Sequence, residues 1–338
     1  MTRIAFAILA VFALVHFSIA SSGDRAFEFN QCITRCNLQK CLDGQVELSP
    51  ALRLTQWTCL DDCKYKCMHE ITDKAVELGE RVHQYYGKWP FWRFAGMQEP
   101  ASVLFSLFNL WAHAKGAAKL RRRVSVFHPM RHYYLVWSWL SINAWVWSSV
   151  FHTRDLPLTE KLDYFSAALA IIYALYFTLI RLFRLYPTSG RTRLTLSTRS
   201  SDSIARRILS IVITLIYLGH VSYLSLLPRF DYTYNMAFNL TIGMSHNILW
   251  LLYSLPFAIF RRFSSQPRSY RPGFVYKAGV FVLLTTCATA LELFDFPAWR
   301  RIIDAHSLWH LATAPIALCW YDFLAEDSLD PSWRDQKS

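Results

Sequence analysis

Seven apolar segments, separated by loops whose charge alternates, constrain the fold of this chain more than any other feature. They lie near residues 99–114, 133–151, 162–180, 208–227, 234–260, 276–294 and 302–324. Most approach the ~20 residues that a helix needs to cross ~30 Å of hydrocarbon. The first is short, and the fifth is long enough to predict a tilt or a kink at Pro256. Because 53% of its residues are hydrophobic, the chain is predicted to be an all-α membrane protein with seven transmembrane helices.

Lysine and arginine residues gather in every second loop between these segments. The basic loops lie at 115–131, 181–207 and 261–277, whereas the other loops are short and carry few positive charges. The positive-inside rule therefore places the basic loops and the tail, 326–338, in the cytosol, and the N-terminal region in the lumen. This distribution accounts for the formal net charge of +12 without a nucleic-acid partner.

Residues 1–20 have the pattern of a secretory signal. An apolar run at 4–20 follows Arg3 and ends with Ser18 and Ala20 in the small-x-small arrangement of a cleavage site. We predict a cleaved signal peptide. The alternative is an uncleaved first span, because the length of the run is borderline for a membrane-spanning helix.

Six of the eight cysteines crowd into the predicted lumenal region, 21–97. They are Cys32, Cys36, Cys41, Cys59, Cys63 and Cys67. An even number of cysteines after a signal peptide predicts disulfides in an oxidising compartment. Zinc is the alternative, but the spacing lacks the C-x2-C pairs of zinc modules. Six cysteines allow about fifteen pairings, and the sequence does not choose among them.

Two histidines, His306 and His310, lie four residues apart near the lumenal start of the last apolar segment. Residues at i and i+4 share one face of a helix, so this pair can chelate one metal ion. At the same lumenal depth the second segment ends with Ser148 and His152, and the third begins with Asp163. Because the connection between these two segments is short, we expect their lumenal ends to be close neighbours.

These five residues suit metal-assisted hydrolysis. Three histidines leave a tetrahedral zinc ion one open position for water, whose pKa the metal lowers toward neutrality. Asp163 can carry the proton from that water to the leaving oxygen, and Ser148 can bond the water or the oxyanion. We therefore predict Zn2+ at His152, His306 and His310, beside a lipid ester or amide as substrate. The alternative for each residue is a structural one, as a polar group that bonds helices together.

Other polar residues in the apolar segments match no ligand spacing. His220, His246 and Asn143 are interpreted as structural. Glu292, near the lumenal end of the sixth segment, is a candidate partner that orients a metal ligand.

At the five candidate residues the sequence resembles the seven-span hydrolase superfamily that includes alkaline ceramidases and adiponectin receptors. The shared pattern is Ser-x3-His, an aspartate eleven positions after that histidine, and a late His-x3-His, and this chain matches every element. The early cysteines, the stretch FWRFAGMQEPASVLFSLFNL at 91–110 and the stretch HTRDLPLTEKLDYFSA at 152–167 resemble one branch, the post-GPI-attachment-to-proteins factor 3 family.

This resemblance implies a GPI-specific phospholipase A2-type hydrolase that removes the sn-2 acyl chain from GPI-anchored proteins during lipid remodelling. It implies a hydrolase domain over 98–325, with zinc ligands His152, His306 and His310. It also implies the Golgi membrane, where the family works in animals, with the endoplasmic reticulum, where it works in yeast, as the alternative. The final residues WRDQKS show no KDEL-like retrieval signal, so the choice of the Golgi rests on the resemblance. A ceramidase-like amidase and a non-catalytic seven-span receptor or assembly factor are the alternative functions. The preferred acyl chain and the oligomeric state stay open.

Overall fold

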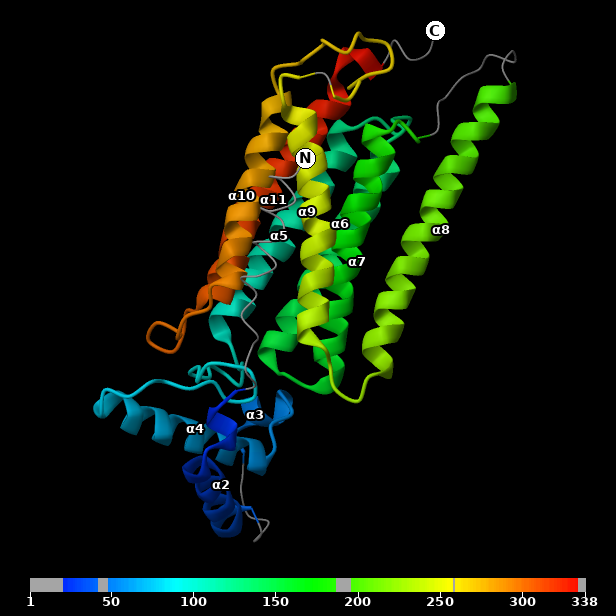
Figure 1. Ribbon diagram of the computed structural model, residues 1–338. Coiled ribbons are helices and arrows are strands. Elements are labelled where there is room, and N and C mark those ends of the chain that lie inside the picture. Colours follow the sequence, from blue (N-terminus) through cyan, green and yellow to red (C-terminus); the bar gives the residue numbers. More distant parts are fainter. Residues whose placement is uncertain (1–20, 42–47, 187–195, 258, 334–338) are drawn as a thin grey trace, which may run out of the picture. The chain divides into compact units, whose positions relative to one another are not determined.

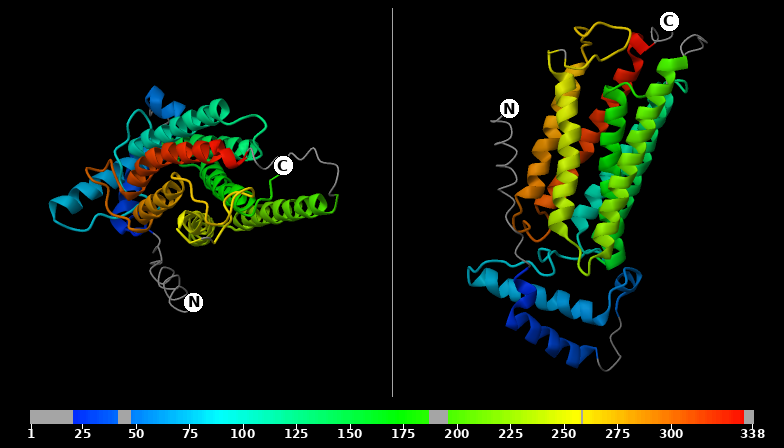
Figure 2. Two further views of the ribbon diagram at one scale, coloured as in Figure 1. Left: turned by 90° about the horizontal axis from the view of Figure 1, so that it is seen from above. Right: turned by 45° about the vertical axis from the view of Figure 1, so that its right-hand side comes forward.

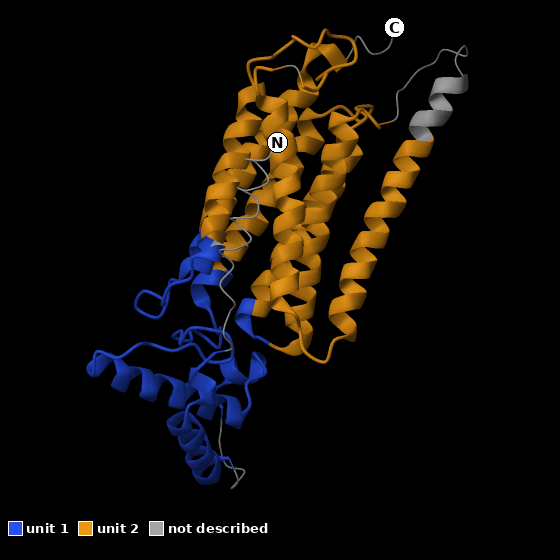
Figure 3. Ribbon diagram, viewed as in Figure 1, with its two compact units in different colours: residues 1–103, 152–155, 291–308 blue, residues 104–151, 156–290, 309–338 orange. Residues whose placement is uncertain are grey.

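The computed structural model describes residues 21–41, 48–186, 196–257 and 259–333. Within these ranges every regular element is a helix, and β-pairing is limited to three isolated bridges. The chain separates into two compact units, shown in different colours in Figure 3. Unit 1 comprises residues 1–103, 152–155 and 291–308, and unit 2 comprises residues 104–151, 156–290 and 309–338. The predicted signal peptide, 1–20, lies outside the described residues.

The described part of unit 1 contains four short or medium helices before residue 80. They are the 3-10 helix η1 (Gly23–Arg25) and the α-helices α2 (Phe27–Lys40), α3 (Pro50–Leu54) and α4 (Cys59–Glu77), coloured blue in Figure 1. Helix α4 begins with a capping box, in which the Thr58 hydroxyl accepts from the Asp61 N–H and the Asp61 carboxylate accepts from the Thr58 N–H. This reciprocal cap fixes the start of α4 at Cys59.

Three nested disulfides join α2, and Cys41 directly after it, to α4. The pairs are Cys32–Cys67, Cys36–Cys63 and Cys41–Cys59. The α4 cysteines recur every four residues and so share one face of that helix. Two helices that run in opposite directions bring the first cysteine of one beside the last cysteine of the other. The disulfide prediction is confirmed, and the antiparallel helix pair supplies the pairing that the spacing left open.

Residues 78–99 and 294–304 of unit 1 lie outside the helices and are fastened by polar contacts. The Trp92 N–H donates to the Arg301 carbonyl at 2.9 Å. The Arg301 guanidinium in turn donates to Nδ1 of His69 at 2.9 Å and to the Asp73 carboxylate at 2.6 Å. The indole of Trp89 donates to Asp295 at 2.9 Å. These contacts bind the segment 291–308 to the disulfide-linked helices and the connection that follows them.

Seven long helices coincide with the seven apolar segments of the sequence, and the greater part of them forms unit 2. They are α5 (Pro100–Arg123), α6 (Arg131–Thr153), α7 (Pro157–Leu182), α8 (Leu196–Leu226), α9 (Tyr232–Ser254), α10 (Val275–Leu293) and α11 (Ala305–Leu329), followed by η2 (Pro331–Trp333). Within unit 2 the long helices run lengthwise beside one another (Figures 1 and 2). The all-helical fold class is therefore confirmed for the described residues.

Two of the seven helices are long and apolar enough to span a membrane by length and composition. These are α7 and the stretch Ile204–Leu226 of α8, while α10 contains a shorter apolar stretch, Val275–Leu291. Polar residues lower the hydropathy elsewhere; α5, for example, carries the buried residues Asn109 and His113. The structure thus supports membrane-spanning character for two helices, and the count of seven spans stays a prediction.

Two helix boundaries differ from those expected. Helix α5 continues to Arg123, so part of the predicted basic loop at 115–131 is helical. Helix α9 ends at Ser254 rather than continuing through a kink toward residue 260. Leu255 precedes Pro256 and is extended, at φ −62° and ψ 151°. The proline ring disfavours a helical conformation for the residue before it, so the helix stops there.

Close helix contacts and a buried ion pair hold unit 2 together. At Gly116 of α5 a Cβ atom would lie 2.0 Å from the ring of Tyr321 on α11, so only glycine permits this approach. At the opposite end of α11 from its histidines, the Arg181 guanidinium makes two bonds of 2.8 and 2.7 Å to the Asp327 carboxylate. Both side chains are buried. Arg181 was expected in a cytosolic loop, but it is a core residue of unit 2.

Candidate active site

The five predicted site residues lie on three helices. Ser148 and His152 lie in the last turns of α6, Asp163 in the second turn of α7, and His306 and His310 in the first turns of α11. The boundary between the units falls within α6 and α11, so His152 and His306 belong to unit 1, and Ser148, Asp163 and His310 to unit 2. His152, His310 and Ser148 are buried.

His152 and His306 face one another in unit 1. Their Nε2 atoms are 3.3 Å apart, and their ring centroids are 5.1 Å apart. His306 lies within a reciprocal cap at the start of α11, where the Ser307 N–H donates to the Asp304 carboxylate and the Asp304 N–H donates to the Ser307 hydroxyl. This cap fixes the first turn of α11, and with it the direction in which His306 leaves the helix.

The buried carboxylate of Glu99 holds the other side of His152. Its Oε2 lies 3.0 Å from Nδ1 of His152, and the Glu99 N–H donates to the His152 carbonyl at 3.0 Å. Lys88 bonds the second carboxylate oxygen of Glu99 and lies 3.2 Å from Asp155. Burial opposes the charge of Lys88, but Glu99 and Asp155 hold the pKa of its ammonium above the usual value.

In unit 2, the hydroxyl of Ser106 joins two of the predicted site residues. It lies 3.0 Å from the Ser148 hydroxyl and 2.9 Å from Nδ1 of His310. Three residues further along α5, the Asn109 amide donates to the His310 carbonyl at 2.6 Å. The ring of Trp145 packs edge-on to the His310 imidazole. Helix α5 therefore positions both the side chain and the backbone of His310.

Asp163 and Glu292 were the two acidic residues singled out in the sequence. Asp163 is partly exposed in α7, six residues after Pro157, which occupies the first position of that helix. Its proposed role in proton transfer stays a prediction. Glu292 lies near the end of α10, and its side chain is outside the described residues.

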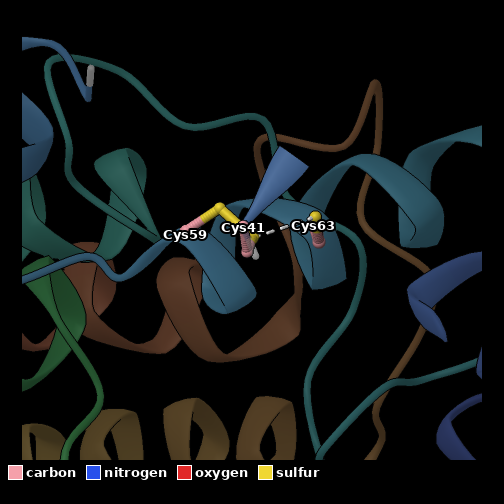
Figure 4. A group of neighbouring side chains, drawn as sticks. All are labelled: Cys41, Cys59 and Cys63. Carbon is pink, nitrogen blue, oxygen red and sulfur yellow. Dashed lines mark hydrogen bonds between the residues drawn. A yellow bond between two sulfur atoms is a disulfide. The ribbon is translucent and has the colours of Figure 1, made fainter. Parts of the chain in front are cut away.

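A second group of possible metal ligands in unit 1 consists of three cysteines. The sulfur atoms of Cys41, Cys59 and Cys63 lie within 4.8 Å of one another (Figure 4). Cys41 and Cys59 are joined by a disulfide, and Cys63 is joined to Cys36. A disulfide sulfur is no thiolate, and metal binding by cysteine requires the thiolate. We therefore assign no metal to these cysteines.

His246 and His220, the two histidines interpreted as structural in the sequence, have contacts of that kind. His246 Nδ1 lies 2.8 Å from the Thr178 hydroxyl, which also accepts from the Trp250 indole at 2.8 Å. His220 is stacked on Phe238, with ring centroids 3.9 Å apart. These contacts agree with the structural interpretation of both histidines.

Comparison with known proteins identifies the family. A model of the Per1-like family matches residues 49–328. The chain belongs to the Per1-like family. It is 39% identical over 316 residues to GPI-specific phospholipase A2-like PGAP3 of Xenopus laevis, covering 92% of this chain and 91% of the relative. It is 38% identical over 314 residues to the protein of that name in Homo sapiens, covering 91% and 90%.

A yeast relative extends the same likeness. The Protein PER1 homolog of Schizosaccharomyces pombe is 38% identical over 310 residues, which cover 90% of this chain and 86% of the relative. No solved structure matches the chain. The predicted family is therefore confirmed.

Sequence reasoning missed two residues that support the candidate site of this Per1-like protein. Glu99 lies directly before Pro100, the first residue of α5, within the stretch used for the family resemblance. An acidic residue at the predicted lumenal edge of an apolar segment was the available signal. Ser106 carried no signal, because serine is common in transmembrane helices and only the packing of α5 brings it to His310.

Proposed function

We propose that this chain is a zinc-dependent lipid ester hydrolase that removes the sn-2 acyl chain from the lipid of GPI-anchored proteins. Relatives named GPI-specific phospholipase A2-like, which match about nine-tenths of the chain, support the substrate and the bond. One observation carries the chemistry: two buried or partly buried imidazoles whose Nε2 atoms face each other at 3.3 Å.

The donor atoms fit zinc. Two nitrogens bound at ~2.05 Å to a tetrahedral ion lie about 3.3 Å apart, and the Nε2 atoms of His152 and His306 have this separation. Glu99 accepts from Nδ1 of His152, which leaves the lone pair at Nε2. His310 is our third ligand, because it follows His306 by one turn of the same helix.

We assign the metal to Nε2 of His310, since its Nδ1 bonds Ser106. When three histidines hold it, zinc supplies a water of lowered pKa as the nucleophile near neutral pH. Nδ1–H of His310 then donates to Ser106, and the Ser106 hydroxyl donates to Ser148. This direction leaves the proton of the Ser148 hydroxyl available for a bond to the substrate.

Ser148 and Asp163 complete the proposed chemistry. The Ser148 hydroxyl donates to the oxygen of the ester carbonyl, where negative charge develops during attack. The Asp163 carboxylate takes a proton from the attacking water and delivers it to the glycerol oxygen as the ester bond breaks. The products are a free fatty acid and a lysolipid that still carries the protein. One water is consumed, and the carboxylate of Asp163 is regenerated.

The proposed setting is a seven-span membrane protein with its N-terminus and its site in the lumen and its C-terminus in the cytosol. The three disulfides support a lumenal unit 1, because such bonds persist in oxidising compartments. The three arginines in the last turn of α5, Arg121, Arg122 and Arg123, support cytosolic placement of that end. The Golgi membrane is the proposed location, with the endoplasmic reticulum as the alternative.

A side-by-side lipid assay tests the proposal. Purified protein is offered a GPI-anchored protein and a ceramide, and the release of fatty acid from each is followed by mass spectrometry. We expect sn-2 fatty acid from the GPI lipid, and a loss of at least a hundredfold in rate for His306→Ala and for Asp163→Ala. Release from ceramide alone would support the amidase. Wild-type rates in both variants would remove these residues from the reaction and favour a non-catalytic receptor or assembly factor.

A further inference from the structure

We propose that Glu99 is a positioning residue for His152, and that Lys88 holds Glu99 in place. The inference rests on the proposed function, because it concerns the metal ligand that this function requires. Under this inference, residues of unit 1 that lie outside the proposed ligand set help to build the metal site.

Glu99 contacts His152 at two points. Its side chain lies 3.0 Å from Nδ1 of the imidazole, and its N–H donates to the carbonyl of the same residue at 3.0 Å. Both side chains are almost fully buried, at 5% and 3% exposed. The backbone contact fixes the distance between the two chain segments, and the carboxylate contact fixes the rotation of the ring.

This arrangement has a chemical consequence at the opposite nitrogen. An ionised carboxylate only accepts hydrogen bonds, so it selects the tautomer of His152 that carries its proton on Nδ1. The lone pair then lies on Nε2, which faces His306. A carboxylate bonded to the far nitrogen of a metal-binding histidine also raises the basicity of the ligand, and its removal typically costs 10- to 100-fold in metal affinity.

Lys88 compensates the negative charge of the buried Glu99 carboxylate and connects it to the core around the disulfide-linked helices. Its ammonium bonds Glu99 and lies 3.2 Å from Asp155, which follows α6 by two residues. Lys88 is itself set by a tight turn, in which the N–H of Tyr85 donates to its carbonyl at 2.8 Å and its own N–H donates to the Tyr85 carbonyl at 3.0 Å. This turn packs through Tyr85 against Phe29 of α2 and so belongs to the core of the disulfide-linked helices.

A buried ion pair that contacts no metal ligand would change stability when it is broken, but not metal affinity. The chain offers a matched control in Asp62, another buried carboxylate of unit 1, which pairs with Arg93 at 2.6 Å and with Lys66. Asp62 contacts no proposed metal ligand among the described residues. Loss of its charge therefore tests the cost of breaking a buried ion pair in unit 1 without touching His152.

The test measures zinc affinity in full-length, detergent-purified protein. Glu99→Ala, Glu99→Gln, Lys88→Met and Asp62→Asn are equilibrated with a series of zinc–chelator buffers, and bound zinc per chain is measured by mass spectrometry. We expect a 10- to 100-fold weaker affinity for Glu99→Ala, a smaller loss for Glu99→Gln and Lys88→Met, and a change of less than threefold for Asp62→Asn. The amide oxygen of Gln can still accept from Nδ1, so this variant retains orientation without charge.

A second readout covers the case in which Glu99→Ala does not fold. Cobalt(II) is added to wild type, to Glu99→Gln and to Asp62→Asn, and the visible absorption of the bound ion reports on its ligands. We expect a shifted spectrum in Glu99→Gln and a wild-type spectrum in Asp62→Asn. Zinc bound equally well by wild type and the Glu99 variants, with an unchanged cobalt spectrum, overturns this inference and leaves the proposed function standing. Wild type that binds neither metal overturns both.

Discussion

Two buried serines on α5, one turn apart, offer a sharp test of how the candidate site is held. Ser106 is fully buried, and its hydroxyl bonds both Ser148 and His310. Ser102 is equally buried, at 1% exposed, but its hydroxyl makes no hydrogen bond to any described residue. Replacing each by alanine removes the same atom from the same helix, so the difference between them isolates the contacts of Ser106.

The expected magnitude follows from those contacts. Ser106→Ala deprives the buried hydroxyl of Ser148 and Nδ1 of His310 of a partner, and a buried polar group that loses its partner typically costs about 1–3 kcal/mol. We expect a fall in unfolding temperature of ~2–4 °C for each kcal/mol. Ser102→Ala loses no bond seen among the described residues and is expected to lie within ~0.5 kcal/mol of wild type.

The assay is thermal unfolding in detergent, with bound zinc measured on the same samples. Ser106 also orients a proposed metal ligand, so Ser106→Ala is expected to weaken zinc binding about tenfold, whereas Ser102→Ala leaves it unchanged. Equal unfolding temperatures and equal zinc affinities for the two variants would refute the reasoning, because the Ser106 contacts would then contribute nothing.

Three further predictions concern the frame around the site. Asp327→Asn is expected to destabilise the protein by about 3–5 kcal/mol, because it leaves the buried Arg181 charge unpaired; calorimetry in detergent measures this. The double variant Cys32→Ser/Cys67→Ser is expected to lose about 3 kcal/mol of its free energy of unfolding, measured with a denaturant. While the inner Cys36–Cys63 bond is intact, the outer disulfide closes a loop of only about ten residues in the unfolded chain. His69→Gln is expected to flatten the pH dependence of stability between about pH 6.5 and 4.

The sign of the His69 effect follows from its pKa. Burial lowers the pKa of this histidine from 6.5 to about 4, although its bond to the Phe91 carbonyl works in the other direction. The unfolded chain therefore binds the proton first as the pH falls below 6.5, and stability declines until about pH 4. An unchanged slope in His69→Gln would contradict this cause.

The other two predictions also have clear opposing results. A loss of about 4 kcal/mol for the outer disulfide, the value for its full loop taken alone, would indicate that the inner bonds do not restrict the unfolded chain. Asp327→Asn with wild-type stability would indicate that water or a neighbouring group compensates the Arg181 charge.

The sequence predicted the helices well because apolar length and loop charge are local signals. All seven apolar segments are helices, and the disulfides join the cysteines that the count implicated. The errors came from local backbone rules and packing. Pro256 ends α9 instead of kinking it, since the proline forces Leu255 out of the helical conformation. Arg181 was counted as a loop charge, but packing against Asp327 buries it.

The candidate site was predictable where helix periodicity decided it and not where tertiary contacts did. Ser148 with His152, and His306 with His310, follow from a spacing of four residues on one helix. Glu99 supports His152 from a chain segment 53 residues away, and no period within one helix reports such a contact. The disulfide pairing could not be predicted for the same reason, because it depends on the opposite directions of α2 and α4 in space.

The most direct test of the account is the effect of zinc on the release of sn-2 fatty acid from a GPI-anchored protein by the purified wild-type chain. The protein is stripped with a chelator, assayed, supplied with one equivalent of zinc and assayed again. We predict that stripping abolishes the release and that zinc restores it in wild type but not in His306→Ala. Undiminished release by protein shown to be free of zinc would contradict the central claim that the histidines act by holding a metal ion.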